Sequence, residues 1–230
     1  MNGILLIDKP KGWTSFDVVN KVRRMVQQSE LNTSNKKRFP VGHTGTLDPL
    51  ATGLLVLLLG TYTKQAPGLT KLDKTYEVTM KLGEISSTGD AEGSLTRVSG
   101  LQPSLVRVRQ ALQQFTGDSM QTPPAFSAIK INGQRAYKLA RDGKTPELAA
   151  RPVHIEQNTL TDYSYPFVRF TSEVSSGTYI RSLVEDLGKI LETGAYMSDL
   201  RRTKVGEFSI TNALQMEGLT PEAIQTALRS

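Results

Sequence analysis

One carboxylate, Asp48, lies in a stretch whose residues favour a rigid turn. Gly45 and Pro49 disfavour both a helix and a central strand there, and the apolar run 54–59 that follows predicts a buried strand. A rigid loop at the mouth of a buried strand can hold one reactive side chain still, so Asp48 is a candidate reactive group. The alternative is an ordinary turn in which Asp48 caps its own backbone.

Charge and cysteine content narrow the classes of protein to which this chain can belong. Its 230 residues carry a formal net charge of +6, which favours polyanions such as RNA or DNA without requiring them. The absence of cysteine excludes disulfides, thiolate zinc sites and thiol catalysis, and fits a reducing compartment. The longest apolar run, 54–59, is far shorter than the ~20 residues that span a bilayer, and no basic leader opens the chain. We therefore expect a cytoplasmic protein without a membrane segment.

The elements around the Asp48 loop follow from local patterns. Residues 4–8 predict a short buried strand. Ser15 is expected to cap the next helix, with Asp17 in its first turn. The apolar stripe of this helix comprises Val18, Val22, Met25 and Val26. The basic residues off the stripe face either RNA or solvent, and these are Lys21, Arg23 and Arg24. Residues 29–40 are polar and basic without periodicity, so this loop either adds phosphate contacts or is a solvated insertion.

Strand alternation is clearest over residues 74–82. Tyr76, Val78, Met80 and Leu82 share one face there, which predicts a half-buried strand. The strand pattern alone favours core packing for Tyr76, with its hydroxyl hydrogen-bonded. Residues 105–115 predict an amphipathic helix closed by Gly117, and residues 167–174 predict a strand.

A glycine turn at Gly177 leads into a third predicted helix. Its apolar stripe comprises Ile180, Leu183, Val184, Leu187 and Ile190. Arg181 lies off this stripe, and Glu185 at i+4 would be its ordinary surface partner.

Basic residues with one interleaved aromatic, Tyr137, occupy residues 130–151. The cations are Lys130, Arg135, Lys138, Arg141, Lys144 and Arg151, opposed by Asp142 and Glu147. This mixture suits single-stranded or looped RNA, in which bases stack and phosphates pair. A solvated basic helix is the alternative.

The full string around Asp48 adds a specific resemblance. GHTGTLDPLATG, residues 42–53, resembles the catalytic motif G-H-x-G-[TS]-L-D-P-x-A-x-G of the TruB family, the tRNA pseudouridine-55 synthases, without departure. By this resemblance Asp48 is the essential nucleophile and His43 lies beside the RNA.

Other stretches resemble further motifs of the family. The family motif K-x-Y matches at Tyr76. By this resemblance Tyr76 stacks on the target base and takes part in proton transfer. [KS]-G-T-Y-[IV]-R matches at residues 176–181, so Arg181 is implied to pair with Asp48, which a guanidinium can orient and keep ionised. In L-R-R-x-x-[VS]-G, Leu200 matches the residue that contacts the bound base, and Arg201 and Arg202 serve phosphates or solvate an edge.

The resemblance also implies the remaining substrate contacts. Residues 124–141 match P-x-x-S-A-x-K and G-x-x-x-Y-x-x-A-R, a mobile thumb that closes over the RNA. Residues 85–93 match T-D-x-x-D-x-x-G only in part, so Asp90 is expected to be a turn residue first. The residues expected to bind substrate are His43, Tyr179, Leu200, Lys9, Lys130, Arg141 and Arg202.

The expected fold is α+β, the pseudouridine synthase fold, with a bent, mostly antiparallel mixed sheet flanked by helices. The resemblance covers residues 3 to 220, so we expect one catalytic domain over 1–230, with a thumb inserted near 118–150 and without the C-terminal RNA-binding extension of the family. Its absence predicts weaker tRNA binding with the chemistry retained.

The implied reaction isomerises uridine 55 of the tRNA T-arm to pseudouridine on a flipped-out base. It needs no cofactor and no metal, and the sequence carries no P-loop or dinucleotide motif. We expect a monomer without an obligate protein partner. Two alternatives stay open: an RNA chaperone on the same fold, which can coexist with the enzyme, and a guide-RNA-dependent synthase.

Overall fold

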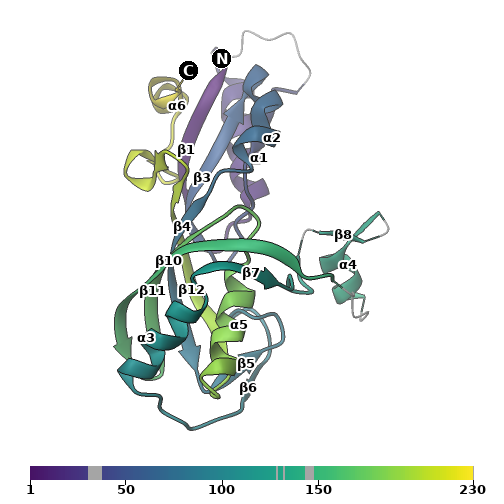
Figure 1. Cartoon of the computed structure of the whole chain (residues 1–230). Helices are drawn as coiled ribbons and strands as arrows, with labels where there is room; N and C mark the ends of the chain where they lie inside the picture. Colours follow the sequence, from purple (N-terminus) through teal and green to yellow (C-terminus); the bar gives the residue numbers. More distant parts are fainter. Residues whose placement is uncertain (31–37, 128, 132, 143–147, 230) are drawn as a thin grey trace. The chain divides into compact units, whose positions relative to one another are not determined.

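The computed structural model describes residues 1–30, 38–127, 129–131, 133–142 and 148–229, without the side chains of residues 130, 131, 135 and 141. The chain divides into two compact units, residues 1–76 with 200–230 and residues 77–199. Strands β4 (Lys74–Leu82) and β12 (Ala195–Val205) each pass along the chain from one unit into the other (Figure 1).

The first unit is built on strand β3. Its strands follow the order β14, β1, β3, β12, with β2 also paired to β3. β1 and β3 are antiparallel over their whole length, from Gly3 opposite Leu59 to Lys9 opposite Gly53. The elements of this unit are β1 (Gly3–Lys9), α1 (Ser15–Gln28), β2 (Val41–His43), β3 (Thr52–Leu59), the 3-10 helix η1 (Gly60–Gln65), α2 (Ala66–Leu69), β13 (Phe208–Ser209), the 3-10 helix η2 (Ile210–Asn212), β14 (Leu214–Gln215) and α6 (Pro221–Ala227).

β3 is buried on both faces, as its continuous apolar run predicts. One face, with Leu55, Leu57 and Leu59, packs against the valines of α1. The other face, with Leu54, Val56 and Leu58, packs against Val205 and Phe208. The predicted strands at 4–8 and 54–59 are confirmed as β1 and β3.

Helix α1 begins one residue earlier than expected, because Thr14 rather than Ser15 is its cap. Thr14 Oγ1 accepts the backbone N–H of Asp17 at 3.1 Å, and Asp17 Oδ2 accepts the backbone N–H of Thr14 at 2.9 Å. This reciprocal pair is a capping box, and Asp17 lies in the first turn as predicted. The predicted valine stripe is buried.

The second unit orders its strands β12, β4, β11, β10, β7. β10 and β11 form a long antiparallel hairpin with two register shifts, and β7 pairs with the other edge of β10. The elements are β5 (Glu84–Ser86), β6 (Leu95–Arg97), α3 (Leu105–Gln114), β7 (Gly117–Gln121), β8 (Lys130–Ile131), β9 (Gln134–Arg135), α4 (Ala136–Arg141), β10 (Arg151–Ser164), β11 (Phe167–Val174) and α5 (Ile180–Ile190). The predicted strand at 167–174 and helix at 105–115 are confirmed.

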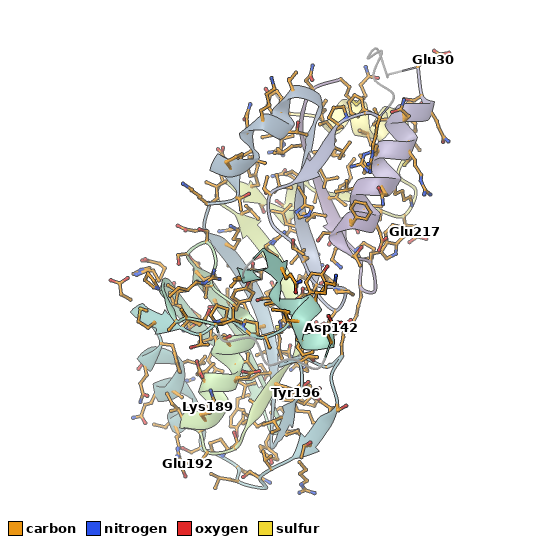
Figure 2. All side chains as sticks on the ribbon, turned by 90° about the vertical axis from the view of Figure 1, so that its right-hand side faces the viewer. Glu30, Asp142, Lys189, Glu192, Tyr196 and Glu217 are labelled. Atoms are coloured by element: carbon orange, nitrogen blue, oxygen red, sulfur yellow. The ribbon has the colours of Figure 1, made fainter. Side chains whose placement is uncertain are left out.

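Two helices cover this sheet, and their apolar faces are close to those predicted. α3 contacts β10 and α5 (Figure 1). Leu183, Val184 and Leu187 of α5 are buried, whereas Ile190 is 39 % exposed and was wrongly included in the buried stripe. It lies at the C-terminal end of the helix, next to the charged Lys189 and Glu192 (Figure 2).

The chain is therefore α+β, as expected from the sequence. The thumb at 118–150 remains a prediction. Residues 117–121 form β7, a strand of the main sheet of the second unit. Of the predicted loop 29–40, residues 31–37 lie outside the described residues.

Candidate active site

The loop between β2 and β3 carries Asp48 and is irregular, as predicted. β2 ends at His43 and β3 begins at Thr52. Leu47 and Leu50 are buried on either side of Asp48, whereas Asp48 itself is half-buried. The apolar side chains therefore fix the loop in the core while the carboxylate between them stays partly accessible.

Hydrogen bonds from outside the loop hold its backbone on both sides of the acid. Ser15 Oγ accepts the backbone N–H of Leu47 at 2.8 Å and lies 3.0 Å from the Leu47 carbonyl oxygen. The Pro49 carbonyl accepts the backbone N–H of Gly12 at 2.8 Å and lies 3.4 Å from Lys9 Nζ. The two residues that flank the candidate nucleophile are thus fixed by the segment that leads into α1.

Arg202, which was expected at an RNA phosphate or an exposed edge, is instead 2 % exposed. Its Nε donates to the Leu54 carbonyl at 2.7 Å, and its Nη2 donates to the Gly45 carbonyl at 3.0 Å. The Gly45 carbonyl lies near the start of the Asp48 loop, and the Leu54 carbonyl lies in β3, which follows the loop. The guanidinium therefore joins the loop to this strand, and the phosphate contact predicted for Arg202 is wrong because its N–H groups are turned inward.

Lys9 was also expected to bind RNA, and it is also buried. Its Nζ lies 2.6 Å from the Trp13 carbonyl oxygen and 3.0 Å from that of Pro10. An ammonium group buried among carbonyl oxygens stabilises the turn that they form and does not present its charge to solvent. Its neighbour Asp8 also has a partner within the protein, because Asp8 Oδ2 lies 2.6 Å from Arg201 Nη2 in an ion pair.

His43 is half-buried at the start of the loop. Its Nδ1 accepts the backbone N–H of Gly45 at 3.3 Å. Burial lowers the pKa of His43 below its usual value, and the charge of Arg202 lowers it further. Since Nδ1 is an acceptor, the neutral ring carries its proton on Nε2 and presents a donor there.

Tyr76 and Leu200 are both buried, with exposures of 9 % and 8 %. Tyr76 belongs to the buried face of β4, which confirms the alternation predicted for residues 74–82. This placement agrees with core packing, and the base-stacking and proton-transfer roles of Tyr76 stay predictions.

Arg181 is the second residue of α5 and is only 7 % exposed, so it was wrong to place it on a surface outside the buried stripe. Nη2 donates to the Phe126 carbonyl at 2.8 Å and Nη1 donates to the Thr88 carbonyl at 3.2 Å. Nη1 also lies 3.6 Å from Asp90 Oδ2. Its guanidinium is thus held in place within the second unit.

Asp90 acts as a turn residue, as expected, and in addition is the ion-pair partner of Arg181. Its Oδ1 accepts from Thr88 Oγ1 at 2.6 Å and from the backbone N–H of Glu92 at 3.1 Å. Glu185, the expected surface partner of Arg181, is half-buried, and this partial burial raises the pKa of its carboxyl.

Tyr179 is half-buried at the N-cap of α5. Gln121 fixes its backbone, because the Gln121 amide accepts the Tyr179 N–H at 2.7 Å and donates to its carbonyl at 3.1 Å. The guanidinium carbon of Arg151 lies 4.9 Å from the centre of the Tyr179 ring, which is a cation–π distance. The Arg151 guanidinium also donates to the Gly177 carbonyl, so the ring and the cation are ordered together.

The basic residues expected around α4 are only partly described. Lys130 lies in β8 and Arg141 ends α4, but their side chains are outside the described part of the structure. Their RNA contacts stay predictions.

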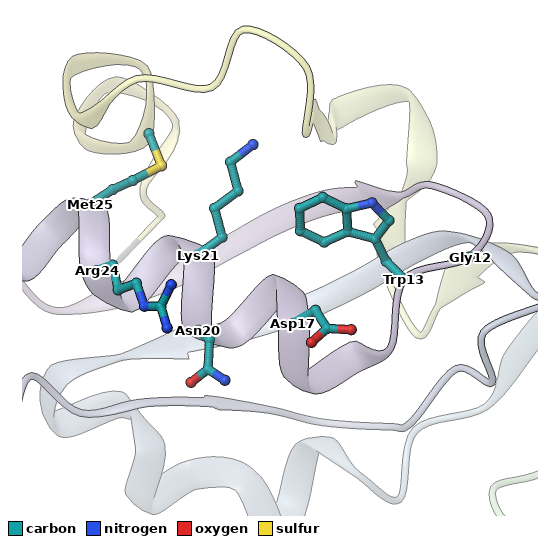
Figure 3. A pocket seen from close by; sticks show the side chains of 7 residues that line it. All are labelled: Gly12, Trp13, Asp17, Asn20, Lys21, Arg24 and Met25. Carbon is teal, nitrogen blue, oxygen red and sulfur yellow. The ribbon is translucent and has the colours of Figure 1, made fainter.

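The basic residues of α1 lie beside a shallow pocket. Lys21 Nζ is 5.4 Å from the centre of the Trp13 ring and donates to the Met216 carbonyl at 3.1 Å (Figure 3). Arg24 is exposed at the same pocket, whereas Arg23 donates to the Val41 carbonyl at 2.9 Å and so holds β2. The sequence did not decide whether Lys21, Arg23 and Arg24 face RNA or solvent. Two of these cations, Lys21 and Arg24, line this pocket, and Arg23 has a structural role.

Sequence reasoning missed several residues that hold the site. Ser15 was taken for a helix cap, and Arg151 for one member of a basic stretch. Gln121 was not singled out. No local pattern signals these roles, because each depends on contact with a residue far away in the chain.

Asp48 and Tyr76 belong to the first unit and Arg181 to the second. The ion pair predicted between Asp48 and Arg181 therefore stays a prediction.

Within the described residues there is no cluster of three or more His, Cys, Asp or Glu side chains that could hold a metal ion. None of the described helices is long and apolar enough to span a membrane.

Comparison with known proteins identifies the family. Residues 32–180 match the model of the TruB family pseudouridylate synthase (N terminal domain), and residues 181–229 match that of the tRNA pseudouridylate synthase B C-terminal domain. A chain in the crystal structure of a Cbf5-Nop10-Gar1 complex superposes with a TM-score of 0.74 and 26% identity, covering 99% of this chain and 59% of that one.

Two curated relatives extend the comparison. The tRNA pseudouridine synthase B of Clostridium novyi is 44% identical over 97% of this chain and 74% of its own length. The protein of the same name from Haemophilus influenzae is 42% identical over 95% of this chain and 67% of its own length. With a matching family model over most of its residues, the family string at 42–53 intact and the fold shared, the chain belongs to the TruB family of pseudouridylate synthases.

Proposed function

We propose that this chain isomerises uridine to pseudouridine in tRNA, and that its target is uridine 55 in the T-loop. The observation that carries the proposal is the unbroken family string 42–53 on a loop whose backbone is fixed on both sides of a half-buried Asp48. The curated relatives from Clostridium novyi and Haemophilus influenzae bear the name of this activity.

Asp48 is the proposed nucleophile. The bond between N1 of uracil and C1′ of the ribose breaks, and a bond between C5 and C1′ forms. The proton on C5 leaves and N1 gains one, so atoms and electrons balance without a second substrate. Asp48 forms a covalent intermediate with C1′ of the sugar or with C6 of the base, and either route returns its carboxylate free.

Arg181 and Tyr76 complete the proposed reaction centre. Arg181, ordered by Asp90 and by two backbone carbonyls, orients the Asp48 carboxylate through paired hydrogen bonds. Tyr76 stacks on the uracil and assists the proton transfer from C5. Leu200 contacts the base from β12.

RNA recognition follows from shape and charge. The target uridine is flipped out of its stack at a cost of a few kcal/mol. The net charge of +6 attracts the phosphates that offset this cost. His43 offers an Nε2–H donor, and Lys130, Arg141 and Tyr179 supply further contacts. In this proposal the enzyme is cytoplasmic, acts as a monomer and needs no obligate protein partner.

The test is conversion of a T-arm stem-loop RNA by the purified full chain, followed by mass-spectrometric mapping of pseudouridine. Asp48→Asn should abolish conversion. Asp73→Asn is the matched control, because it removes the same charge from an exposed site in the same unit, and it should leave conversion unchanged. Conversion at the wild-type rate by Asp48→Asn would exclude the nucleophile.

The same assay addresses the alternatives. Turnover of bare stem-loop RNA without partners would exclude a guide-dependent enzyme. If the Asp48→Asn variant still accelerates tRNA folding, an RNA chaperone activity coexists with the isomerase on one scaffold.

A further inference from the structure

Ser15 is the first residue of α1, but the helix does not use its hydroxyl. Thr14 caps the helix by accepting the Asp17 backbone N–H at 3.1 Å. Ser15 is 2 % exposed, so its hydroxyl does not face solvent either. A buried hydroxyl needs partners within the protein, and the identity of those partners shows what the residue does.

Both partners of the Ser15 hydroxyl belong to Leu47, which is 32 positions away in the chain. Oγ accepts the Leu47 N–H at 2.8 Å and donates to the Leu47 carbonyl at 3.0 Å. A serine hydroxyl has one donor and can accept as well, so one side chain satisfies both polar groups of this buried residue. Leu47 itself is 3 % exposed, so bulk solvent does not reach its polar groups in place of the hydroxyl.

Leu47 directly precedes Asp48, so fixing its N–H and its carbonyl fixes the peptide from which Asp48 begins. On the other side, the Gly12 N–H binds the Pro49 carbonyl at 2.8 Å. The direction of the Asp48 side chain is therefore set from both neighbours by the segment around the start of α1.

We propose that Ser15 is a positioning residue for Asp48. The inference rests on the proposed function, in which the Asp48 carboxylate attacks the flipped nucleotide. Ser15 touches no reacting atom in this account and acts through the backbone of Leu47. A misplacement of the nucleophile by ~1 Å can cost about 100-fold in rate, although the substrate still binds.

The experiment compares Ser15→Ala with Ser172→Ala in the full chain. Ser172 is a fully buried serine of β11 in the other unit, and it donates to Asn158 Oδ1 at 2.8 Å, so its alanine variant also loses a buried hydrogen bond. For each protein, three quantities are measured: the single-turnover rate of pseudouridine formation with enzyme in excess, the dissociation constant for the stem-loop RNA, and the thermal midpoint.

Ser15→Ala should slow the single-turnover rate by about 10- to 100-fold while its RNA affinity is retained. Ser172→Ala should lower the thermal midpoint but keep the wild-type rate. A wild-type rate for Ser15→Ala overturns the proposal. Equal slowing in both variants also overturns it, because the rate would then follow general stability and not the position of the hydroxyl.

If Ser15→Ala does not fold, the same three measurements are made on Ser15→Cys, and its single-turnover rate tests the proposal. The thiol keeps the shape of the side chain but is a weak hydrogen-bond donor and acceptor. A slow Ser15→Cys enzyme with retained RNA affinity supports the positioning role, and a wild-type rate overturns it. Wild-type chain and Asp48→Asn are assayed together. An inactive wild type would overturn the proposed function itself, whereas an active wild type with an inactive Asp48→Asn and a normal Ser15→Ala would overturn only this inference.

Discussion

Replacing Arg202 with methionine separates a structural role of this side chain from a role in RNA binding. The guanidinium donates to the carbonyl of Gly45 in the Asp48 loop and to the carbonyl of Leu54 in β3, the strand that follows this loop. Methionine has a similar length and no donor. The variant should therefore lose stability and should bind RNA with an unchanged dependence on salt.

The size of the effect follows from the two carbonyls. A buried carbonyl that loses its donor costs about 1–3 kcal/mol, and the partly buried Gly45 carbonyl costs at most as much as that of Leu54, so the pair costs at most about 6 kcal/mol. Part of this is offset, because a buried cation costs several kcal/mol when no carboxylate pairs with it, and no ion pair of Arg202 is found among the described residues. We expect a net loss of about 2–3 kcal/mol, which in a chain of this size lowers Tm by about 4–12 °C.

The matched control is Lys204→Met, which removes an exposed cation two positions further along β12. It should change stability by no more than about 0.5 kcal/mol. Tm is measured by calorimetry, and the affinity for stem-loop RNA is measured over a series of salt concentrations. The reasoning is refuted if Arg202→Met has the same Tm as the control variant while its affinity for RNA falls. In that case the slope of log K against log salt would also become smaller by about 1, as a lost phosphate contact requires.

The pKa values of the two histidines of the chain should be shifted in opposite directions, since burial lowers the pKa of His43 whereas the hydrogen bond that His154 donates to Asp118 raises that of His154. Acidification through pH 6.5 should therefore protonate His154 before His43. His43 takes up its proton more readily in the unfolded chain than in the folded one, so protonation of His43 lowers the free energy of unfolding as pH falls below 6.5. NMR titration of the imidazole signals, assigned with His154→Gln, checks this, and His43 titrating above His154 would contradict it. Gly53→Ala should be more destabilising than Gly12→Ala by about 1–3 kcal/mol, because both residues have positive φ but only at Gly53 would a Cβ lie 2.3 Å from a backbone oxygen, whereas Gly12 faces open space. Equal Tm losses for the two alanine variants would show that the close approach at Gly53 is absent.

Local patterns predicted the elements that consist of regular repeats. The run 54–59 is apolar at every position and forms a strand buried on both faces. Residues 74–82 alternate and form a strand with one buried face. β10, residues 151–164, was not predicted, because polar residues dominate it and two register shifts break its alternation.

The sequence by itself determined the family, the irregular loop around Asp48 and the strand that follows it, because these depend on residue types within a dozen neighbouring positions. The tertiary structure alone decided which polar side chains hold that loop. Ser15 meets Leu47 across 32 positions, and Arg202 meets Gly45 across 157. A cation in the sequence looks the same whether it faces phosphate or carbonyl oxygens. Only the packing of β12 beside β3 turns Arg202 inward, where the carbonyl groups of the loop replace water around its charge.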